Sequence, residues 1–237
     1  MVKWTLVTGG AKRLGAEICQ TLAASGHNIV VHYHNSHDDA INVQAACKKL
    51  GVEAELLQGD FSTQETTQKF IDAYLSQFTE TEHLINNVGN YLIKSALNMP
   101  LKEWYDLFQT NLHAPFALIQ ALTPSLKKQQ GSIVNIGIAG MNHLPADTYA
   151  TAYSITKASL LMLTKSVAKE LAPDHVRVNM VSPGYIDNAV DLPDPSRLPM
   201  GRPATTQEVA RAVEFLINKD NAYITGQNIE VSGGVRL

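Results

Sequence analysis

The chain has 237 residues, 45% of them hydrophobic and 17% charged, a composition typical of a globular domain that excludes a disordered segment. A formal net charge of −3 gives no electrostatic reason to expect nucleic acid or an anionic membrane as a partner. The two cysteines lack metal-ligand spacing, and we find no signal peptide and no run of about 18 apolar residues. We therefore expect a soluble cytoplasmic protein with reduced thiols.

Seven apolar runs of strand length follow one another along the chain, with helical patterns between them. Their near-continuous hydrophobicity is typical of strands that are buried on both faces of a parallel sheet. The predicted strands are Trp4–Thr8, Asn28–Tyr33, Ala54–Gln58, His83–Asn87, Ser132–Gly137, Arg177–Ser182 and Asn228–Ser232.

Two long helices are predicted between the later strands. Apolar residues at three- and four-residue steps predict one helix from about residue 101 towards residue 127. A second helix contains residues 152–163 and continues to Leu171, with Pro173 as a stop signal. This alternation predicts an α/β fold, a Rossmann-type, doubly wound, seven-stranded parallel sheet with helices on both faces, in a single domain over residues 1–237. Four prolines within residues 185–203 predict a substrate loop over a site.

The first predicted strand leads directly into TGGAKRLG, Thr8 to Gly15, and then into a helix. Glycines at such a turn let the backbone approach a pyrophosphate, which the helix N-terminus binds through free N–H groups. The second strand lacks the carboxylate that would hold the ribose hydroxyls of NAD, and no acid follows before Asp38. Cations and hydrogen-bond donors suit the 2′-phosphate of NADP(H) instead. The candidates are Lys12, Arg13, His34, Asn35 and Ser36.

The histidines of this segment, His32, His34 and His37, could alternatively bind a metal ion. Cysteines and further suitably spaced ligands are lacking, so we expect no metal site there.

Tyr153 and Lys157 are four residues apart in a predicted helix and therefore lie on one face of it. An unperturbed tyrosine has a pKa near ~10, which is too high for ready proton exchange at neutral pH. A neighbouring ammonium group stabilises the phenolate, so we expect Lys157 to lower the pKa of Tyr153. The competing interpretation is a packed tyrosine beside a lysine that reaches to solvent.

With these residues assembled, the chain resembles the short-chain dehydrogenase/reductase family over essentially its whole length. Its motifs occur in the family's order: TGGAKRLG, GDFS (Gly59–Ser62), NNVG (Asn86–Gly89), TNLH with Asn111, YSITK, SPGYI (Ser182–Ile186) and ITGQNIEVSGG near the C-terminus. A single YxxxK motif occurs easily by chance, whereas seven elements in register do not.

The resemblance implies an oxidoreductase in which Tyr153 donates the proton, Lys157 binds the nicotinamide ribose, and Asn111 in a distorted helix turn holds a water of the proton relay. Asp60 would meet the adenine, Asn87 would lie along the cofactor, and the turn after Pro183 would pass close to the nicotinamide. We expect the cofactor site to contain Gly9, Lys12, Arg13, Leu14, Gly15, His34, Asn35, Ser36, Asp60, Phe61, Asn87, Val88, Gly89, Tyr153, Lys157, Pro183, Gly184, Ile186 and Asn188.

Three departures from the family pattern matter. Arg13 replaces the middle glycine of the first motif, and Asn188 stands where a threonine is expected. The serine expected about thirteen residues before Tyr153 is missing, because counting back gives Gly140 and aligning the motif gives Gly137. Losing one oriented donor typically costs ~10²–10³ in rate. The candidates that could replace it are Asn142, His143, Thr148 and Thr151.

The resemblance implies two candidate substrate classes, of which we prefer a carbonyl compound and keep a pterin as the alternative. Similarity to 3-oxoacyl-[acyl-carrier-protein] reductases implies a small-molecule or acyl-carrier substrate, reduced with NADPH. The KRLG and HYHNS segments resemble pteridine reductases, in which Tyr91 would stack on a flat ring, although Gly89 and Gly137 lack that branch's polar contacts. We expect Tyr91, Gly137 and Tyr185 to meet the substrate. A protein that binds NADP without turnover is the alternative of another class.

The same resemblance implies that the two long helices pack against other copies of the chain. The expected assembly is a homotetramer or a homodimer.

Overall fold

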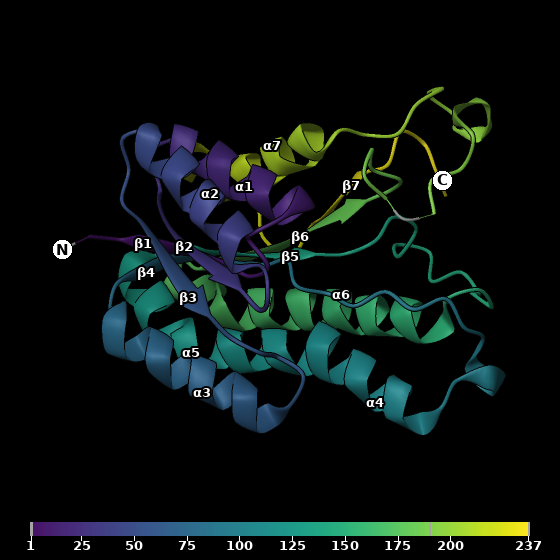
Figure 1. Ribbon diagram of the computed structural model, residues 1–237, viewed down its shortest axis with the longest axis horizontal. Helices are drawn as coiled ribbons and strands as arrows, with labels where there is room; N and C mark the ends of the chain where they lie inside the picture. The colour runs from purple at the N-terminus through teal and green to yellow at the C-terminus, as the bar shows by residue number, and fades with distance from the viewer. Residues whose placement is uncertain (1, 190, 237) are drawn as a thin grey trace.

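Seven strands form a single, entirely parallel sheet in the computed structural model, which describes residues 2–189 and 191–236 (Figure 1). The order of the strands across the sheet is β3-β2-β1-β4-β5-β6-β7, which confirms the predicted fold class. Their bounds are β1 Trp4–Val7, β2 Asn28–Tyr33, β3 Ala54–Gln58, β4 Thr81–Asn86, β5 Ser132–Ile136, β6 Arg177–Pro183 and β7 Asn228–Val231.

The strand order creates a crevice beside β1. Leu6 of β1 pairs with Val30 of β2 on one side and with Leu84 of β4 on the other. The chain therefore winds outward in opposite directions from β1, and in parallel sheets ligands bind at the carboxyl ends of the strands at such a switch point. Every residue of β4, β5 and β6 is buried, including several polar ones, as expected for central strands that helices cover on both faces.

Helices cover both faces of the sheet (Figure 1). One face carries α1 Arg13–Ala24, α2 His37–Lys49 and α7 Thr206–Ile217, and the other carries α3 Gln64–Gln77, α4 Leu101–Phe108, α5 Ala114–Gln129 and α6 Thr151–Leu171. Each layer buries its own apolar cluster against the sheet, with Ile18 and Val213 in one and Tyr74 and Leu118 in the other. Burial of each such side chain contributes roughly 1.5–3 kcal/mol.

The helix predicted over residues 101–127 is interrupted by a π-helical turn at Gln109–His113, between α4 and α5. Periodicity alone predicted a continuous helix because a π turn adds only one residue to the repeat. The turn buries Asn111 completely, and its side chain bonds to the backbone of Asn90. The predicted distortion at Asn111 is therefore present. The second long helix, α6, ends at Leu171 as predicted.

The proline-rich segment 185–203 leaves the sheet after β6 and returns to nearly the same place. The backbone N–H of Asp187 donates to the carbonyl of Ala204, and the N–H of Ala204 donates to the carbonyl of Tyr185. This pairing holds both ends of the loop beside the carboxyl end of β6.

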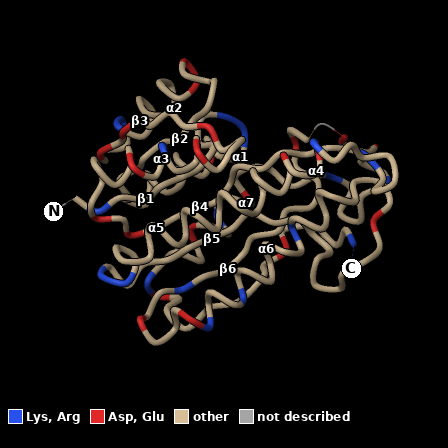
Figure 2. Tube along the Cα trace, turned by 90° about the horizontal axis from the view of Figure 1, so that it is seen from below, with Lys and Arg blue, Asp and Glu red and all other residues tan. Residues whose placement is uncertain are grey.

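Acidic and basic residues are interspersed along the whole chain (Figure 2). No helix in the described part of the chain combines the length and apolar character that a membrane crossing requires.

Candidate active site

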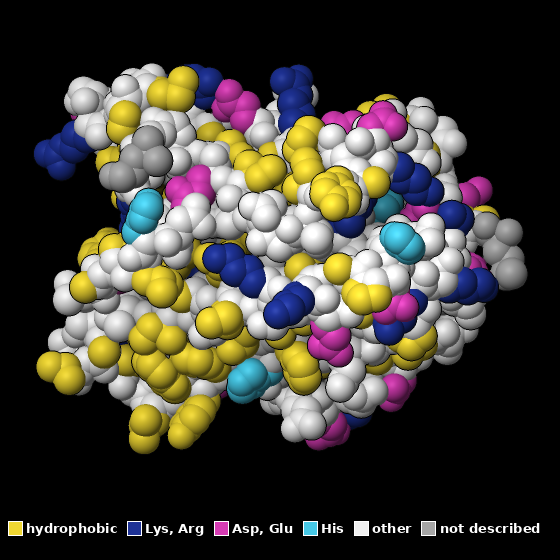
Figure 3. Space-filling view, turned by 180° about the vertical axis from the view of Figure 1, so that it is seen from behind, with side chains coloured by type: hydrophobic (Ala, Val, Ile, Leu, Met, Phe, Trp, Pro, Cys, Tyr) yellow, Lys and Arg dark blue, Asp and Glu magenta, His cyan; other side chains and the backbone are white. Residues whose placement is uncertain are grey.

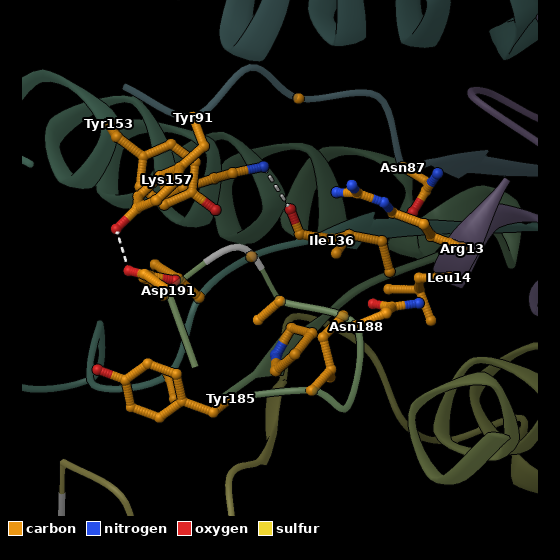
Figure 4. Close-up of a pocket in the computed structure, with 18 of the residues that line it drawn as sticks. Arg13, Leu14, Asn87, Tyr91, Ile136, Tyr153, Lys157, Tyr185, Asn188 and Asp191 are labelled. Carbon is orange, nitrogen blue, oxygen red and sulfur yellow. Dashed lines mark hydrogen bonds between the residues drawn. The ribbon is translucent and has the colours of Figure 1, made fainter. Parts of the chain in front are cut away.

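A cavity of about 510 Å³ opens at the carboxyl ends of β1, β4, β5 and β6. Most of the predicted site residues line it: Gly9, Lys12, Arg13, Leu14, Gly15, Asn87, Val88, Gly89, Tyr91, Gly137, Tyr153, Lys157, Pro183, Gly184, Tyr185, Ile186 and Asn188. Figure 4 shows Arg13, Leu14 and Asn87 on one side of the cavity and Tyr91, Tyr153 and Asp191 on the other.

The glycine-rich turn is held by close backbone contacts. A methyl group on Gly15 would overlap the carbonyl oxygen of Gly9 and would lie 2.7 Å from Nδ2 of Asn87, so glycine is required there. The buried ring of His32 supports the turn from β2, because its Nδ1 accepts the N–H of Gly9 at 2.9 Å and its Nε2 lies 3.2 Å from the carbonyl oxygen of Gly59. Both nitrogens of His32 are thus occupied by backbone groups.

Arg13, which replaces the family's middle glycine, has a backbone φ of 49°. This left-handed conformation costs an L-residue roughly 1–2 kcal/mol. The chain keeps the glycine-like backbone at this position and adds a guanidinium that borders the cavity.

Asn87 and Thr8 join the ends of β4 and β1. The Asn87 side chain donates to the carbonyl oxygens of Thr8 at 2.9 Å and Gly9 at 3.2 Å. The hydroxyl oxygen of Thr8 accepts the N–H groups of Asn87 and Val88. These bonds fix the width of the crevice at the switch point.

Tyr153 and Lys157 lie one turn apart in α6, with the Lys157 ammonium 5.7 Å from the centre of the Tyr153 ring. Lys157 is 3% exposed, and its Nζ donates to the carbonyl oxygen of Ile136 at 2.8 Å (Figure 4). A methyl group on Gly89 would lie 3.2 Å from that ammonium, so the absence of a side chain there gives Lys157 its space. Lysine, tyrosine and the end of β5 therefore meet at one point of the cavity wall.

The electrostatics of this pair correct the expectation from the sequence. Burial raises the pKa of Tyr153 to about 12, although part of the ring borders the cavity, and Arg236 opposes that rise while Asp191 adds to it. Burial also lowers the pKa of Lys157 to about 8. The predicted lowering of the Tyr153 pKa is therefore wrong for the protein alone, because desolvation outweighs the positive charge of Arg236 that opposes it.

Asn111 positions other residues and does not itself line the cavity. Its Oδ1 accepts the N–H of Asn90, and its Nδ2 donates to the Asn90 carbonyl and to the hydroxyl of Thr156. These bonds tie the segment that carries Gly89 to the helix that carries Lys157.

Tyr91 is hydrogen-bonded to the loop that follows β6, on the same side of the cavity. Its hydroxyl donates to Oδ2 of Asp191 at 2.8 Å, and its ring packs edge-on against Tyr153 with ring centres 4.8 Å apart (Figure 4). Burial and the Asp191 carboxylate raise the pKa of Tyr91. The Tyr91 ring is therefore held in place by its contacts with Tyr153 and Asp191.

The missing serine has no replacement among the candidates from the sequence. A side chain on Gly137 would run into Ser182 and Met180, so this glycine contributes only backbone to the cavity. The side-chain Oδ1 of Asn142 accepts a bond from the side-chain amide of Asn228, and the Thr151 hydroxyl donates to the backbone carbonyl of Asp147. His143 and Thr148 border a different depression. The neighbouring Ile138 presents an apolar wall to the cavity.

Five predicted cofactor residues do not line this cavity: His34, Asn35, Ser36, Asp60 and Phe61. The Phe61 ring is buried against His32, with ring centres 4.4 Å apart, so its side chain belongs to the core. Asp60 accepts bonds from Ser62 that lower its pKa, although burial opposes the shift, and one of its oxygens lies 3.8 Å from His34. These residues follow β2 and β3, beyond the glycine turn.

Several cavity residues were missed by sequence reasoning: Ile136, Ile138, Ala139, Tyr149, Ala189, Asp191, Val235 and Arg236. Asp191 lies within the predicted substrate loop, which is the one available signal for it. Nothing in the sequence indicated Arg236, because it reaches the cavity from the C-terminal turn after β7.

The cavity fits a bound dinucleotide. Its glycine turn opens onto the N-terminus of α1, where free N–H groups suit a pyrophosphate. In the same cavity, Oδ1 of Asn188 is buried and has no hydrogen-bond partner among the described residues. A carboxamide group would supply the missing donor.

The comparisons with known proteins agree over the whole chain. The family model described as "Enoyl-(Acyl carrier protein) reductase" matches residues 9–236. The chain is 36% identical over 247 residues to the 3-oxoacyl-[acyl-carrier-protein] reductase FabG of Staphylococcus epidermidis, covering 100% of both chains.

Solved structures show the same likeness. Acetoin dehydrogenase YohF from Salmonella typhimurium superposes with a TM-score of 0.90 at 30% identity, covering 98% of this chain and 97% of that one. A blue fluorescent protein from a metagenomic library, solved in complex with NADPH, gives a TM-score of 0.91 at 27% identity, covering 99% of this chain and 98% of that one.

Proposed function

Because the chain belongs to the short-chain dehydrogenase/reductase family, we propose that it is an NADPH-dependent reductase of a carbonyl or C=N group in a small-molecule or acyl-carrier substrate, similar to 3-oxoacyl-[acyl-carrier-protein] reductases. The observation that carries the proposal is the pair formed by Tyr153 and Lys157, which border one cavity together with the glycine turn. The proposed location is the cytoplasm, consistent with two buried free thiols.

We favour NADPH over NADH because positively charged side chains lie where they could bind its 2′-phosphate. Lys12 and Arg13 both border the cavity at the start of α1. Lys12 pairs with Asp39 at 2.9 Å, and this exposed ion pair can open at small cost. Arg13 and His34 add donors on the side where the adenosine would lie.

NADPH, when bound, supplies the hydride that reduces the substrate. In our proposal the Tyr153 hydroxyl gives its proton to the substrate heteroatom, which is the carbonyl oxygen of a ketone. Lys157 holds a ribose and, through its positive charge, stabilises the phenolate that remains. Asn111 fixes the position of the segment that carries Gly89 relative to α6, through its bonds to Asn90 and Thr156. Ile138 provides no second donor, so Tyr153 carries the oxyanion stabilisation with less help than the family pattern implies.

The test is loss of NADPH absorbance with acetoacetyl thioester, diketones, quinones and dihydropterins, repeated with NADH. We expect turnover with NADPH above NADH. Replacing Tyr153 by Phe should reduce turnover by about 10²–10⁴ and leave NADPH affinity within a few-fold, because only the acid is lost. Tyr223→Phe, at a fully exposed tyrosine outside the cavity, is the matched control.

Three results would contradict parts of the proposal. Equal rates with NADH would overturn the cofactor assignment. Turnover with dihydropterins alone would favour the pteridine reductase alternative. Tight NADPH binding without oxidation by any carbonyl would identify a binding protein.

We also propose that the chain forms a homotetramer or a homodimer through its helices. Apolar side chains on α4, α5 and α6 are exposed, with Leu101 at 73%, Tyr105 at 65% and Met162 at 68%. Figure 3 shows hydrophobic side chains gathered at the lower left, the end of the molecule where α4 lies. Sedimentation equilibrium should give a multiple of the 25.9 kDa chain mass, and Met162→Glu should shift the distribution towards monomer.

A further inference from the structure

His83 in β4 is buried at the end of the sheet opposite the cavity. Its side chain is 1% exposed, and neither ring nitrogen has a hydrogen-bond partner among the described residues. Leaving a buried polar group unpaired destabilises the folded protein. The ring packs edge-on against His27, with centres 5.1 Å apart. This contact gives neither nitrogen of His83 a hydrogen bond. His83 therefore has lone-pair capacity that the fold does not use.

Two further ligating groups face the same point. His27 follows α1 and stands directly before β2, and Glu82 precedes His83 in β4. One ligating atom from each of the three residues lies within 4.8 Å of the others, and Oε2 of Glu82 is 3.8 Å from Nε2 of His83. Tetrahedral zinc with bonds of about 2.0–2.2 Å places its ligand atoms roughly 3.4 Å apart. His27 is half-buried and follows a turn, so its side chain can move closer to the other two ligands and shorten these distances when an ion binds.

We propose that His27, Glu82 and His83 form a binding site for a divalent transition-metal ion, with Zn²⁺ as the best match. Two imidazoles and one carboxylate are a ligand set that Zn²⁺ accepts, and a water would complete the tetrahedron. This site is separate from the three histidines of the 32–37 segment, for which the sequence predicted no metal.

The charged neighbours allow this ion and limit its affinity. Lys3 and Lys219 both lie on Oε1 of Glu82, at 3.2 and 2.9 Å, so Oε2 faces the imidazole without them. Glu214 adds a negative charge near His27, whereas the buried Arg177 adds a positive charge near His83.

The bound ion would join the turn before β2 to the start of β4. These segments lie on the two sides of β1, at its amino end. The active-site cavity lies at the carboxyl ends of the same strands, so metal binding should raise stability and leave the NADPH site in place.

The test is titration of the metal-free full chain with Zn²⁺ against a chromophoric chelator, and with Co²⁺ followed by its visible absorption. We expect about one ion per chain, with a tetrahedral Co²⁺ spectrum and a higher melting temperature. His27→Ala and His83→Leu should each weaken binding by at least about tenfold. Lys219→Ala should tighten Zn²⁺ binding severalfold, because it removes from the Glu82 carboxylate a positive charge that repels the metal ion.

The controls are His143→Ala and His175→Asn, which remove exposed histidines elsewhere and should leave the Zn²⁺ affinity within twofold. Binding that is equally tight in His27→Ala, or no binding stronger than millimolar, would overturn the proposal. If His83→Leu fails to fold, His27→Ala and Lys219→Ala still decide it. A more stable His83→Leu with unchanged Zn²⁺ binding would show that His83 is only an unpaired core residue.

Discussion

The two sides of the cavity differ in how they are made. The proposed nucleotide side, from Gly9 to Gly15, consists of backbone groups in fixed positions, braced by His32 and Asn87. The proposed substrate side consists of side chains from separate segments, with Tyr91 after β4, Asp191 after β6 and Arg236 after β7. A backbone cradle tolerates few changes because added atoms collide, whereas a wall of side chains can vary while the fold stays the same.

The largest expected effect lies on the nucleotide side. Gly15→Ala should raise the Kd for NADPH by about 100-fold or more, which is about 3 kcal/mol, because the methyl group overlaps the Gly9 carbonyl. The matched control is Gly51→Ala, whose methyl meets nothing within 4 Å although its φ of 90° is strained. It should lose stability and keep NADPH affinity, both measured by fluorescence titration and urea unfolding. Affinity of Gly15→Ala within threefold of the unchanged chain would contradict a rigid backbone cradle.

An intermediate effect is expected at Lys157, where the two sides meet. Its pKa falls from 10.5 to about 8 in the folded chain, so the folded state binds that proton less tightly than the unfolded state does. Stability should therefore rise as pH increases from about 8 towards 10.5, by up to about 3 kcal/mol relative to Lys157→Met. At pH 7 the Lys157→Met variant should be more stable than the unchanged chain and should lack turnover.

Urea unfolding of both proteins at pH 7 and pH 10 measures that difference. Titration of other groups cancels in the comparison because the two chains share them. If the two proteins differ equally at both pH values, the ammonium is not desolvated in the folded chain.

The smallest effect is expected on the substrate side, where the charges of Asp191 and Arg236 shift the pKa of Tyr153 in opposite directions. In the proposed reaction Tyr153 must be protonated, so kcat should fall as pH rises through its pKa. Asp191 raises that pKa and Arg236 lowers it. Asp191→Asn should move the fall in kcat to lower pH, and Arg236→Gln should move it to higher pH.

Tyr91→Phe is the control for this pair, since it removes the bond to Asp191 and leaves the carboxylate charged. Its profile should stay close to that of the unchanged chain. Shifts of Asp191→Asn and Arg236→Gln in the same direction would show that the loop acts by changing shape and not by charge.

The sequence by itself determined the fold class, the glycine turn and the Tyr153–Lys157 pair. Hydrophobic runs, glycine positions and a spacing of four residues act locally, so they can be read without knowing which strands are neighbours. The family resemblance extended this to Asn87, Asn111 and the turn at Pro183.

Only the tertiary structure decided which distant side chains meet. Arg236 reaches the cavity, Phe61 turns into the core, and Gly137 offers no room for a side chain because Met180 and Ser182 fill it. His27 and His83 meet because β1 pairs with both β2 and β4, a contact between residues 56 positions apart. Burial raises the pKa of Tyr153, whereas the sequence predicted that it is lowered. Desolvation depends on every atom packed around a group, and the chain order does not record that packing.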